Sequence, residues 1–583
     1  MDIEKVKSQS QEWADLLGRA QTAMMRAGQL SVDKAVGEEY SLVDFTSVMN
    51  AYLTALPQLI ADPVRTMQSV QTYWMNWANA WQEAWSGEKP GAQDKRFRDK
   101  TWDEEPVLRG LKDSHIALEN AVEDFLDGLP EGSKDSLKVK FFTRQMMSAL
   151  SPANQLLINP AAREKLVETE GQSVLDGFRN LVEDLERGEG RLDIATNDPT
   201  AFVVGRDLAA TPGKVIYENE LMQLIHYAPL TETQKKRPLI FVPPWINKFY
   251  IFDMRPDNSM VRFMLEQGHS VFLISWVNPT KAHAHLSFED YMKLGPLTAL
   301  DVAGKVTGEK KFDMLGFCIG GILVTATLAY LAAKKDKRVV TATTLATMVD
   351  FTDVGETGVF IDNERLGAMR KYMEKTGYLE NHHLQDMFSM LRENDLVWSF
   401  HVTNYLMGNK PPAFDLLFWN ADSTRLPAAM LLWYLERVYL QNGLRKPGHL
   451  VLDGVAIDIS KIEVPMFVLA TKEDHIAPWR SIYPATQILK GEITFVLGGS
   501  GHIAGVINPP AKKPKYGYWT NDTYPANHED WLSGATRHEG SWWPAWVAWM
   551  AERTTEEQVP ARVPGEGPLP AIEDAPGRYV LAK

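Results

Sequence analysis

The most constraining feature of this sequence is an unbroken run of uncharged residues from Met314 to Ala333, which two lysines follow. A run of this length could cross a membrane as one helix. Three glycines stand in its first half, directly after the β-like residues Lys311–Leu315, and a buried strand, a tight turn and a buried helix produce the same hydropathy. No other segment is apolar enough to be a membrane partner. We therefore predict a strand over Phe312–Leu315 and a helix beginning near Ile319, and no transmembrane segment.

The chain after about residue 200 alternates between strand-like and helix-like segments. Short apolar runs predict strands at Arg237–Val242, Ser270–Trp276, Val340–Met348, Val464–Ala470 and Ile493–Leu497. A hairpin is predicted at Lys214–Tyr227, and helices are predicted at Met260–Gln267 and Leu286–Val306. Strands that alternate with helices argue for a mostly parallel sheet with helices on both faces. The predicted fold class is therefore α/β.

We predict two domains with a boundary near residue 200. Residues 1–200 read as helical, and residues 201–583 hold the α/β pattern. Within the second domain the pattern breaks over about 350–450, a helical and aromatic-rich insertion that suggests a cap over a site, with extra core as the alternative. The last residues, about 555–583, are rich in proline and predict an extended surface strap.

Four tryptophans in the predicted helical domain share one face of a helix. Trp74, Trp77, Trp81 and Trp85 recur at helical spacing. Such a stripe is most often packing, either internal or against a partner subunit. The alternative is an exposed apolar surface that docks on an apolar partner or phase, since indoles favour the boundary between apolar and aqueous phases.

Charge and cysteine content exclude several classes of function. Lys and Arg number 61 and Asp and Glu number 75, which gives a formal net charge of −14. Because this acidic chain lacks the basic field of a nucleic-acid binder, we expect no nucleic-acid partner. One cysteine permits no intrachain disulfide, which fits a reducing compartment. The first residues lack the apolar core of a secretory signal, so we expect a cytoplasmic protein.

The uncharged run contains Gly316-Phe317-Cys318-Ile319-Gly320, in which a potential nucleophile stands between a predicted strand and a predicted helix. This is the context of a nucleophile elbow, as found in α/β-hydrolases. The turn strains the backbone of the nucleophile, and glycines let strand and helix pass closely. Cys318 stands where serine is usual. The alternative is a buried structural thiol, because isolated cysteines are commonly core residues.

In α/β-hydrolases the catalytic acid and then the histidine follow the nucleophile along the chain. Asp474 comes just after one predicted strand and His502 just after the last. Loops at the carboxyl ends of parallel strands are where such sheets build active sites. Glu473 is the rival acid, and His475 is the rival histidine, although it adjoins the proposed acid and would point elsewhere. We predict a catalytic triad of Cys318, Asp474 and His502.

The predicted roles follow from acidity. A free thiol titrates near a pH of about 8.5, so His502 would draw its proton or hold the thiolate as an ion pair. Asp474 would fix the imidazole tautomer and stabilise the imidazolium. Two backbone N–H groups would stabilise negative charge on the substrate oxygen. We predict that Ile319 supplies one and that Ile246 supplies the other, with Asn247 as the alternative.

Several blocks of the sequence resemble the signature blocks of polyhydroxyalkanoate synthases. The resemblance covers about residues 100–583, is looser before that, and rests on the blocks together. They are SPANQLLINP (151–160), VGRDLAATPGKVIYENELMQLIHY (204–227), VPPWINKFYIFD (242–253), GFCIGG (316–321), LLFWNADSTRLP (416–427), TKEDHIAPW (471–479) and GGSGHIAGVINPPA (498–511). The single-chain size and the run WYLERVYLQNG (433–443) look most like the class I enzymes of that family.

The resemblance implies an α/β-hydrolase fold with a helical cap insertion and a separate N-terminal helical domain. It also implies an acyltransferase that polymerises (R)-3-hydroxyacyl-CoA, favouring short chains such as 3-hydroxybutyryl-CoA, and releases CoA. Cys318 would carry the acyl group as a thioester, which the terminal hydroxyl of a growing chain attacks. In this family the aspartate, here Asp474, is assigned to orienting the histidine or to activating the hydroxyl through it. No cofactor and no metal are implied.

Two other functions remain open at this point. The first is a cysteine-dependent thioesterase or polyester hydrolase on the same scaffold. The second is a non-enzymatic coat protein of storage granules, which would adhere through the tryptophan stripe. The products formed from 3-hydroxybutyryl-CoA separate the enzymes, and a Cys318→Ala variant separates an enzyme from a coat protein.

The family resemblance also implies partners. It predicts a homodimer that sits on polymer granules together with small granule-coating proteins, and the N-terminal helical domain is the candidate for these contacts. CoA is strongly anionic, and Lys512, Lys513 and Lys515 follow His502 closely. These lysines could bind CoA, although a solvated charge run is the commoner explanation. Trp398 and Trp419 could line a dry pocket or serve in plain packing.

Overall fold

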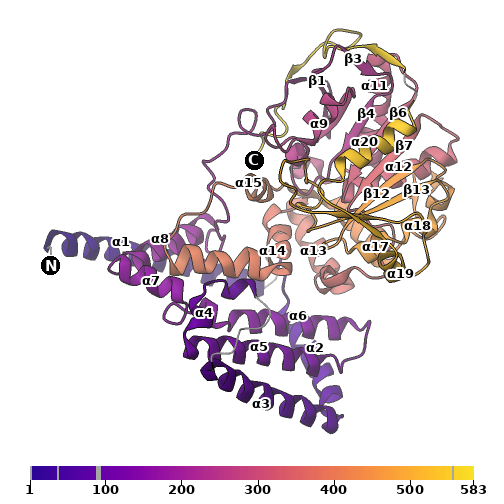
Figure 1. Cartoon of the computed structure of the whole chain (residues 1–583). Coiled ribbons are helices and arrows are strands. Elements are labelled where there is room, and N and C mark those ends of the chain that lie inside the picture. The colour runs from indigo at the N-terminus through magenta and orange to yellow at the C-terminus, as the bar shows by residue number, and fades with distance from the viewer. Residues whose placement is uncertain (1–2, 36–38, 87–93, 555–556) are drawn as a thin grey trace. The chain divides into compact units, whose positions relative to one another are not determined.

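The computed structural model describes residues 3–35, 39–86, 94–554 and 557–583, and the chain forms two compact units (Figure 1). Unit 1 comprises Met1–Asp198, Gly358–Phe360 and Asp386–Ala413. Unit 2 comprises Pro199–Thr357, Ile361–Gln385 and Phe414–Lys583. Unit 1 thus includes a segment from the middle of the predicted cap insertion. The functional roles assigned to the two predicted domains stay predictions.

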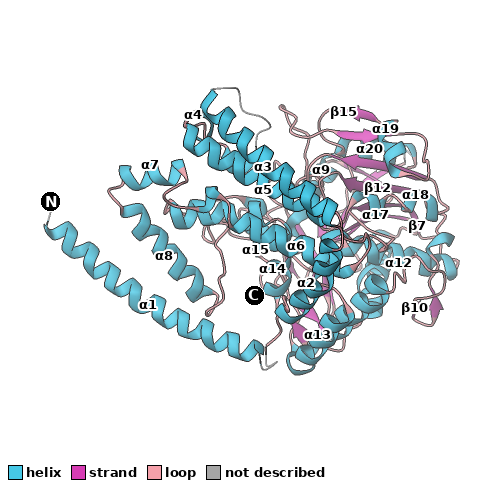
Figure 2. Cartoon of the chain, turned by 90° about the horizontal axis from the view of Figure 1, so that it is seen from below, coloured by secondary structure: helices cyan, strands magenta, loops and turns pink. Residues whose placement is uncertain are grey.

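Unit 1 is built from helices and loops over its described residues (Figure 2). Its longer helices are α1 (Ile3–Ala35), α2 (Phe45–Ile60), α3 (Pro63–Ser86), α5 (Pro106–Leu126), α6 (Lys134–Ala149), α7 (Pro160–Glu168) and α8 (Gln172–Arg187), and a short α4 (Thr101–Glu104) precedes α5. Helix α3 packs against α5, and α2 packs against α6. Gly110 permits the first approach, because a Cβ there would lie 2.6 Å from the Trp81 ring.

The four tryptophans of α3 include one that packs and three that form an exposed apolar surface, the two interpretations left open by the sequence. Trp81 packs on Gly110 of α5. The other three remain solvent-accessible, with exposed fractions of 57% for Trp74, 37% for Trp77 and 67% for Trp85. One indole is therefore packing, and three belong to the surface of unit 1.

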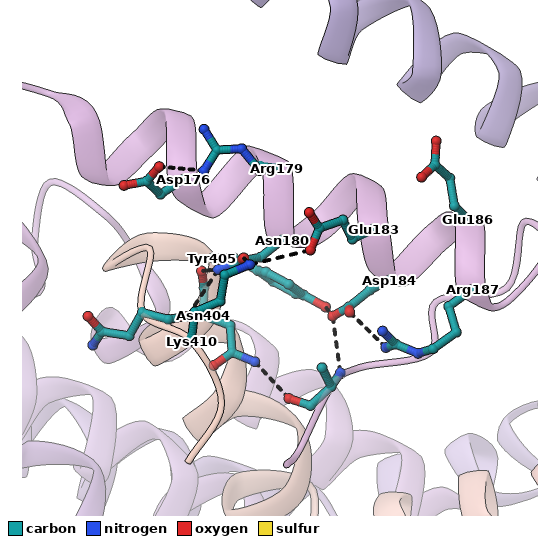
Figure 3. A network of polar contacts seen from close by, with 12 residues as sticks. Asp176, Arg179, Asn180, Glu183, Asp184, Glu186, Arg187, Asn404, Tyr405 and Lys410 are labelled. Carbon is teal, nitrogen blue, oxygen red and sulfur yellow. Dashed lines mark hydrogen bonds and ion pairs between the residues drawn. The ribbon is translucent and has the colours of Figure 1, made fainter. Parts of the chain in front are cut away.

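The inserted segment Asp386–Ala413 is fixed to α8 by a polar network (Figure 3). The Asn180 side-chain amide donates to the backbone carbonyls of Asn404 and Asn409 at 2.9 and 3.0 Å. The Tyr405 hydroxyl donates to the Asp184 carboxylate at 2.6 Å. Because a Cβ at Gly177 would overlap the Tyr405 carbonyl, glycine is required where the segment crosses α8. Part of the insertion between two strands of unit 2 is therefore an integral piece of unit 1.

Unit 2 contains, over the described residues, an 11-stranded sheet with the order β15-β14-β13-β12-β7-β6-β4-β5-β2-β1-β17. The strands are β1 (Gly213–Glu218), β2 (Met222–Tyr227), β4 (Leu239–Val242), β5 (Val271–Trp276), β6 (Phe312–Phe317), β7 (Val339–Leu345), β12 (Met466–Thr471), β13 (Ile493–Gly498), β14 (Tyr518–Thr520), β15 (Thr536–His538) and β17 (Glu573–Asp574). From β13 to β5 every pairing is parallel, and the outer strands pair antiparallel. The predicted mostly parallel sheet is confirmed.

The helices of unit 2 alternate with these strands or lie in the insertion between β7 and β12. They are α9 (Met260–Glu266), α10 (Phe288–Met292), α11 (Thr298–Thr307), α12 (Ile319–Ala333), α13 (Asn363–Thr376), α14 (Asn381–Leu391, shared with unit 1), α15 (Asp415–Ala421), α16 (Ala428–Trp433), α17 (Trp479–Ile482), α18 (Ala485–Ile488), α19 (His528–Ser533) and α20 (Trp543–Glu552). The single helix predicted over Leu286–Val306 is wrong: a π-helical turn, Lys293–Leu297, interrupts it at Gly295, which has non-helical dihedral angles before Pro296.

The uncharged run Met314–Ala333 forms most of β6 and all of α12, as predicted. Strand β6 is buried along its whole length, and α12 is buried over most of it. Such a strand and helix are apolar on all sides because protein surrounds them on all sides. Among the described helices, none combines the length and apolarity that a membrane span requires.

The proline-rich tail lies along unit 2 in extended form. Strand β16 (Gln558–Pro560) pairs with β3 (Thr233–Lys235), and β17 pairs with β1. Val580 near its end is buried in the main hydrophobic core. The tail therefore completes both the edge of the sheet and part of the core.

Candidate active site

Cys318 occupies a sharp turn between β6 and α12. Its backbone has φ 53° and ψ −124°, a conformation that costs energy for a residue with a side chain. The Cys318 N–H donates to the Leu345 carbonyl of β7 at 2.9 Å, which fixes the turn to the neighbouring strand. The thiol stands at the N-terminus of α12, at the carboxyl end of a central parallel strand. This geometry is that of a nucleophile elbow.

Glycines on both sides of Cys318 allow the close passage of chain segments. A Cβ at Gly316 would lie 2.6 Å from the Gly321 Cα. A Cβ at Gly320 would overlap the Val242 carbonyl oxygen and lie 2.6 Å from the Pro243 carbonyl oxygen. The elbow is therefore packed directly against the end of β4, and only glycine fits at these two positions.

A Gly320→Ala substitution is expected to destabilise the protein by about 1–3 kcal/mol and to lower activity, because backbone atoms that cannot move aside oppose the added methyl group. The matched control is Gly367→Ala in α13, where a Cβ would meet nothing within 4 Å. The control should leave stability unchanged or raise it by up to about 1 kcal/mol, because alanine favours a helix over glycine. Thermal unfolding midpoints and turnover rates of both variants check this. Equal stability of the two variants would contradict the packing described here.

Asp474 lies in the loop after β12, and hydrogen bonds to both carboxylate oxygens hold its side chain in place. One carboxylate oxygen accepts the backbone N–H groups of Ile476 and Ala477 at 2.9 and 2.8 Å. The other oxygen accepts the Thr471 hydroxyl at 3.1 Å and lies 2.7 Å from His502 Nδ1. Burial alone would raise the pKa of Asp474, but His502 and the two backbone donors outweigh it and lower the pKa. Asp474 is thus a buried, ionised carboxylate held in one orientation.

His502 lies in the turn that follows β13, and its ring is held on two sides. Nδ1 faces the Asp474 carboxylate, and the ring stacks on Phe317 with the centroids 5.1 Å apart. The Cys318 side chain is near enough to His502 to favour the protonated imidazole. Burial lowers the pKa of His502, but the Asp474 carboxylate and the Cys318 side chain outweigh it and raise the pKa to about 10. The structure therefore brings Cys318, His502 and Asp474 together in this order.

The two rival residues lie elsewhere in the hydrogen-bond pattern. The His502–Asp474 bond excludes Glu473 from that position, and the Glu473 backbone N–H instead donates to the Ser500 carbonyl at 2.9 Å. His475 follows Asp474 directly, and its side chain takes no part in the hydrogen bonds of the Asp474 carboxylate described above. The geometry favours Asp474 and His502 over both rivals.

The predicted backbone donors lie at the ends of two adjoining segments. Ile319 is the first residue of α12, where backbone N–H groups have no partner within the helix. The loop that contains Ile246 leaves β4 beside Gly320, and the Ile246 carbonyl accepts the Thr424 N–H at 2.9 Å. Next to this bond, Asn247 forms an isolated antiparallel β-bridge with Ser423. Both donors of an oxyanion hole stay predictions.

Tyr434 is a residue near Cys318 that no sequence motif marks as part of the site. Burial, followed by the electrostatic influence of Cys318, raises the pKa of Tyr434 well above its usual value. Tyr434 is a protonated, neutral neighbour of the thiol, and it begins the π-helical turn Tyr434–Leu440. The abundance of aromatic residues in the insertion indicated such a neighbour without showing which one.

The two candidate lining tryptophans differ in their surroundings. Trp419 is buried in the core of unit 2, and its indole N–H donates to the Lys248 carbonyl at 2.7 Å. Trp398 belongs to the inserted segment in unit 1, where its ring lies 5.6 Å from that of His401. Packing accounts for Trp419, and a lining role for Trp398 stays a prediction.

The parallel sheet, the strained nucleophile turn and the order of the three clustered residues define an α/β-hydrolase fold, and the model of that fold matches residues 238–509. The model described as "Poly-beta-hydroxybutyrate polymerase (PhaC) N-terminus" matches residues 93–264.

Curated relatives cover most of the chain. A poly(3-hydroxyalkanoate) polymerase of Methylorubrum extorquens is 46% identical over 85% of this chain and 82% of its own length. The polymerase subunit PhaC of Cupriavidus necator is 41% identical over 91% of both chains. The poly(3-hydroxyalkanoate) polymerase 1 of Ectopseudomonas oleovorans is 36% identical over 91% of this chain and 94% of its own. The chain belongs to the poly(3-hydroxyalkanoate) polymerase family and is an enzyme of the acyltransferase type.

Proposed function

We propose that this enzyme polymerises (R)-3-hydroxyacyl-CoA, with 3-hydroxybutyryl-CoA as the preferred substrate, through a thioester on Cys318. The observation that carries the proposal is the cluster in which Asp474 holds His502 at 2.7 Å and His502 meets Cys318 on a strained turn. The family relationship supplies the polymerising reaction, since the relatives are named poly(3-hydroxyalkanoate) polymerases.

In the first half-reaction, the thiolate of Cys318 attacks the carbonyl carbon of the CoA thioester. The new bond joins the Cys318 sulfur to the acyl carbon, and the bond between that carbon and the CoA sulfur breaks. The imidazolium of His502 gives its proton to the departing CoA thiolate, so that neutral CoA leaves. The raised pKa of His502, to about 10, favours the imidazolium required for this step. The Ile319 N–H, with Ile246 or Asn247, would stabilise the oxyanion.

In the second half-reaction, the terminal hydroxyl of a growing chain attacks the acyl group on Cys318. His502, now neutral, takes the hydroxyl proton and passes it to the Cys318 sulfur as the thioester bond breaks. The acyl group stays activated while it is bound to Cys318, because the enzyme thioester is similar in energy to the CoA thioester. Its transfer to the chain is favourable, since the product is a more stable oxoester. Asp474 stabilises the imidazolium that forms in this step.

Water would compete with the chain hydroxyl, so the cluster must be dry. Asp474 and His502 are buried, and the Phe317 ring covers one face of the imidazole. The half-buried, neutral Tyr434 adds a further aromatic neighbour on the cysteine side. A water-poor site of this kind favours transfer over hydrolysis.

The decisive experiment supplies (R)-3-hydroxybutyryl-CoA and follows free thiol together with the acyl product. Polymer formed in step with CoA release supports the proposal. Free 3-hydroxybutyrate without polymer would instead support a thioesterase or polyester hydrolase. A series of 3-hydroxyacyl-CoA substrates of increasing chain length tests the short-chain preference, which predicts the fastest acylation with the four-carbon substrate.

An unusually apolar surface on α2 and α3 supports attachment to the polymer. Helix α2 carries no charged side chain, and α3 carries only Arg65 and Glu83. Their exposed large apolar residues are Phe45, Met49, Leu53, Leu56, Ile60, Val64, Met67, Val70, Trp74, Met75, Trp77 and Trp85. Exposed apolar surface on this scale marks a site of interaction. Homodimer formation and the granule-coating proteins stay predictions from the family resemblance.

The double substitution Met67→Ser and Trp74→Ser is expected to reduce the fraction of enzyme bound to polymer particles, because both side chains are exposed on α3. The rate of Cys318 acylation should not change. The matched control is Leu157→Ser with Val167→Ser, which removes from other parts of unit 1 two apolar side chains that are at least as exposed. Sedimentation of particles with bound enzyme measures the effect. Equal binding of both double variants would exclude the α3 surface as the attachment site.

A further inference from the structure

Helix α20 and the residue before it carry buried tryptophans. Their indole N–H groups all donate to other segments of unit 2, the unit to which α20 belongs. Trp542 precedes the helix, and Trp543, Trp546 and Trp549 lie within it. Trp546 donates to the Thr343 hydroxyl of β7 at 2.8 Å, and Trp549 donates to the Thr494 hydroxyl of β13 at 2.9 Å. These two bonds fasten α20 to strands of the sheet.

The other two indoles donate to the turn that carries His502. Trp542 donates to the Gly505 carbonyl and Trp543 to the Val506 carbonyl, each at 3.0 Å and each buried. The turn is closed by bonds from the Gly505 N–H to the Gly501 carbonyl at 2.8 Å and from the Val506 N–H to the Ile503 carbonyl at 3.1 Å. The acceptors of the two indoles are therefore in the same hydrogen-bonded turn as His502.

Both rings are themselves immobilised by packing. The Trp542 ring stacks on Phe467 of β12 with the centroids 5.9 Å apart. Strand β12 is the one that leads into the Asp474 loop, so Trp542 contacts the strand of the acid and the turn of the histidine together. The Trp543 ring packs on Phe263 of α9 at 5.3 Å. Donors held this firmly can set the position of the carbonyls that they bind.

We propose that Trp542 and Trp543 are positioning residues that set the distance of His502 from Asp474 and Cys318. They act through the turn, since their indole N–H groups hold the Gly505 and Val506 carbonyls and touch neither substrate nor the reacting atoms. Displacement of the turn would lengthen the bonds of His502 on both sides. The inference rests on the proposed catalytic role of His502.

The test compares Trp542→Phe and Trp543→Phe with Trp546→Phe and Trp549→Phe in the full-length enzyme. Each substitution keeps an aromatic ring and removes one indole N–H, so all four variants should lose thermal stability to a similar extent. The first pair should in addition lose about tenfold to a hundredfold in kcat, because small displacements of a catalytic group are costly. KM for (R)-3-hydroxybutyryl-CoA should not change, since neither residue contacts the substrate. The control pair should keep the kcat of the parent enzyme.

The pH profile gives a readout that a purely structural role would not move. Asp474 and Cys318 together hold the pKa of His502 high, so a His502 that has moved away from them loses its proton at lower pH. The alkaline limb of kcat/KM should therefore shift to lower pH in Trp542→Phe and Trp543→Phe. It should stay in place in the two control variants.

A His502→Ala variant separates failure of this inference from failure of the proposed function. One outcome is that His502→Ala is inactive while all four tryptophan variants share one kcat and one pH profile. That outcome would overturn the positioning role and leave the proposed function intact. Active His502→Ala would overturn both. If Trp542→Phe does not fold, Trp543→Phe carries the comparison alone, because its bond is to the same turn.

Discussion

A Cys318→Ala variant is expected to release CoA from (R)-3-hydroxybutyryl-CoA more slowly than the parent enzyme by a factor of about 10⁴ or more, since the thiolate is the only group proposed to form the covalent intermediate. The fold should survive, because the substitution leaves the backbone bond from the Cys318 N–H to Leu345 in place. Free thiol measured over time gives the rate, and circular dichroism gives the fold. Turnover at the parent rate would remove Cys318 from the mechanism.

A Cys318→Ser variant tests whether the acyl intermediate must be a thioester. Serine can form an acyl intermediate, but that intermediate is an oxoester, and its transfer to a chain hydroxyl gives a product of similar energy. We expect slow acylation and almost no chain growth. Mass spectrometry of the intact protein should detect any acyl-serine that accumulates. Polymer formed by Cys318→Ser at the parent rate would contradict the thioester argument.

An Asp474→Asn substitution is expected to lower kcat by a factor of about 10²–10⁴, by analogy with triads in which the acid holds the imidazole tautomer. The new amide can present a donor to His502 Nδ1, where the carboxylate now accepts at 2.7 Å. Glu473→Gln is the matched control, because it changes the adjacent carboxylate, which is outside the described hydrogen bond. Equal losses in both variants would show that Asp474 has no special role.

The same variant makes a prediction about pH. The pKa of His502 is raised to about 10 in the folded protein, against a value of about 6.5 for an unfolded imidazole. A raised pKa contributes stability that is fully present below pH of about 6.5 and is lost as pH rises towards 10. Asp474→Asn removes the main source of this shift. The difference in thermal midpoint between parent and variant should therefore shrink as pH rises from about 6.5 to 10.

An unchanging difference across that range would contradict the coupling between Asp474 and His502. At acid pH the dependence is opposite, because there stability is lost as the pH falls. The pKa of Asp474 is lowered, so its stabilising effect is present above its unfolded pKa and is lost as pH falls through the lower folded value.

Much of the central sheet was predictable because its strands are buried on both faces and read as continuous apolar runs. The hairpin Lys214–Tyr227 and the strand–turn–helix around Cys318 follow from glycine, turn residues and hydropathy, and the structure confirms both. The three residues chosen for the site lie together because each follows a parallel strand. The Cys318 and Asp474 variants described above test their chemical roles.

Other features depend on contacts that no local pattern reveals. Strands β14 and β15 are each three residues long, too short for an alternating pattern to be recognised. The sequence shows the cluster of tryptophans in and before α20 but not their indole bonds to the His502 turn, because the two segments are far apart in the chain. The assignment of Asp386–Ala413 to unit 1 likewise depends on carbonyls recognised by Asn180, and backbone carbonyls leave no signature in the sequence.

That last assignment determines how the protein can be dissected. The chain enters unit 1 at its beginning and returns to it within the insertion between β7 and β12, so no single cut separates the two units. Removing residues before 199 would strip Asn404, Tyr405 and Asn409 of their partners on α8 and leave their polar groups facing water. A truncated enzyme would thus carry an orphaned helical segment within its catalytic half. Domain-swap chimeras between relatives should therefore exchange all three segments of unit 1 together, residues 1–198, 358–360 and 386–413.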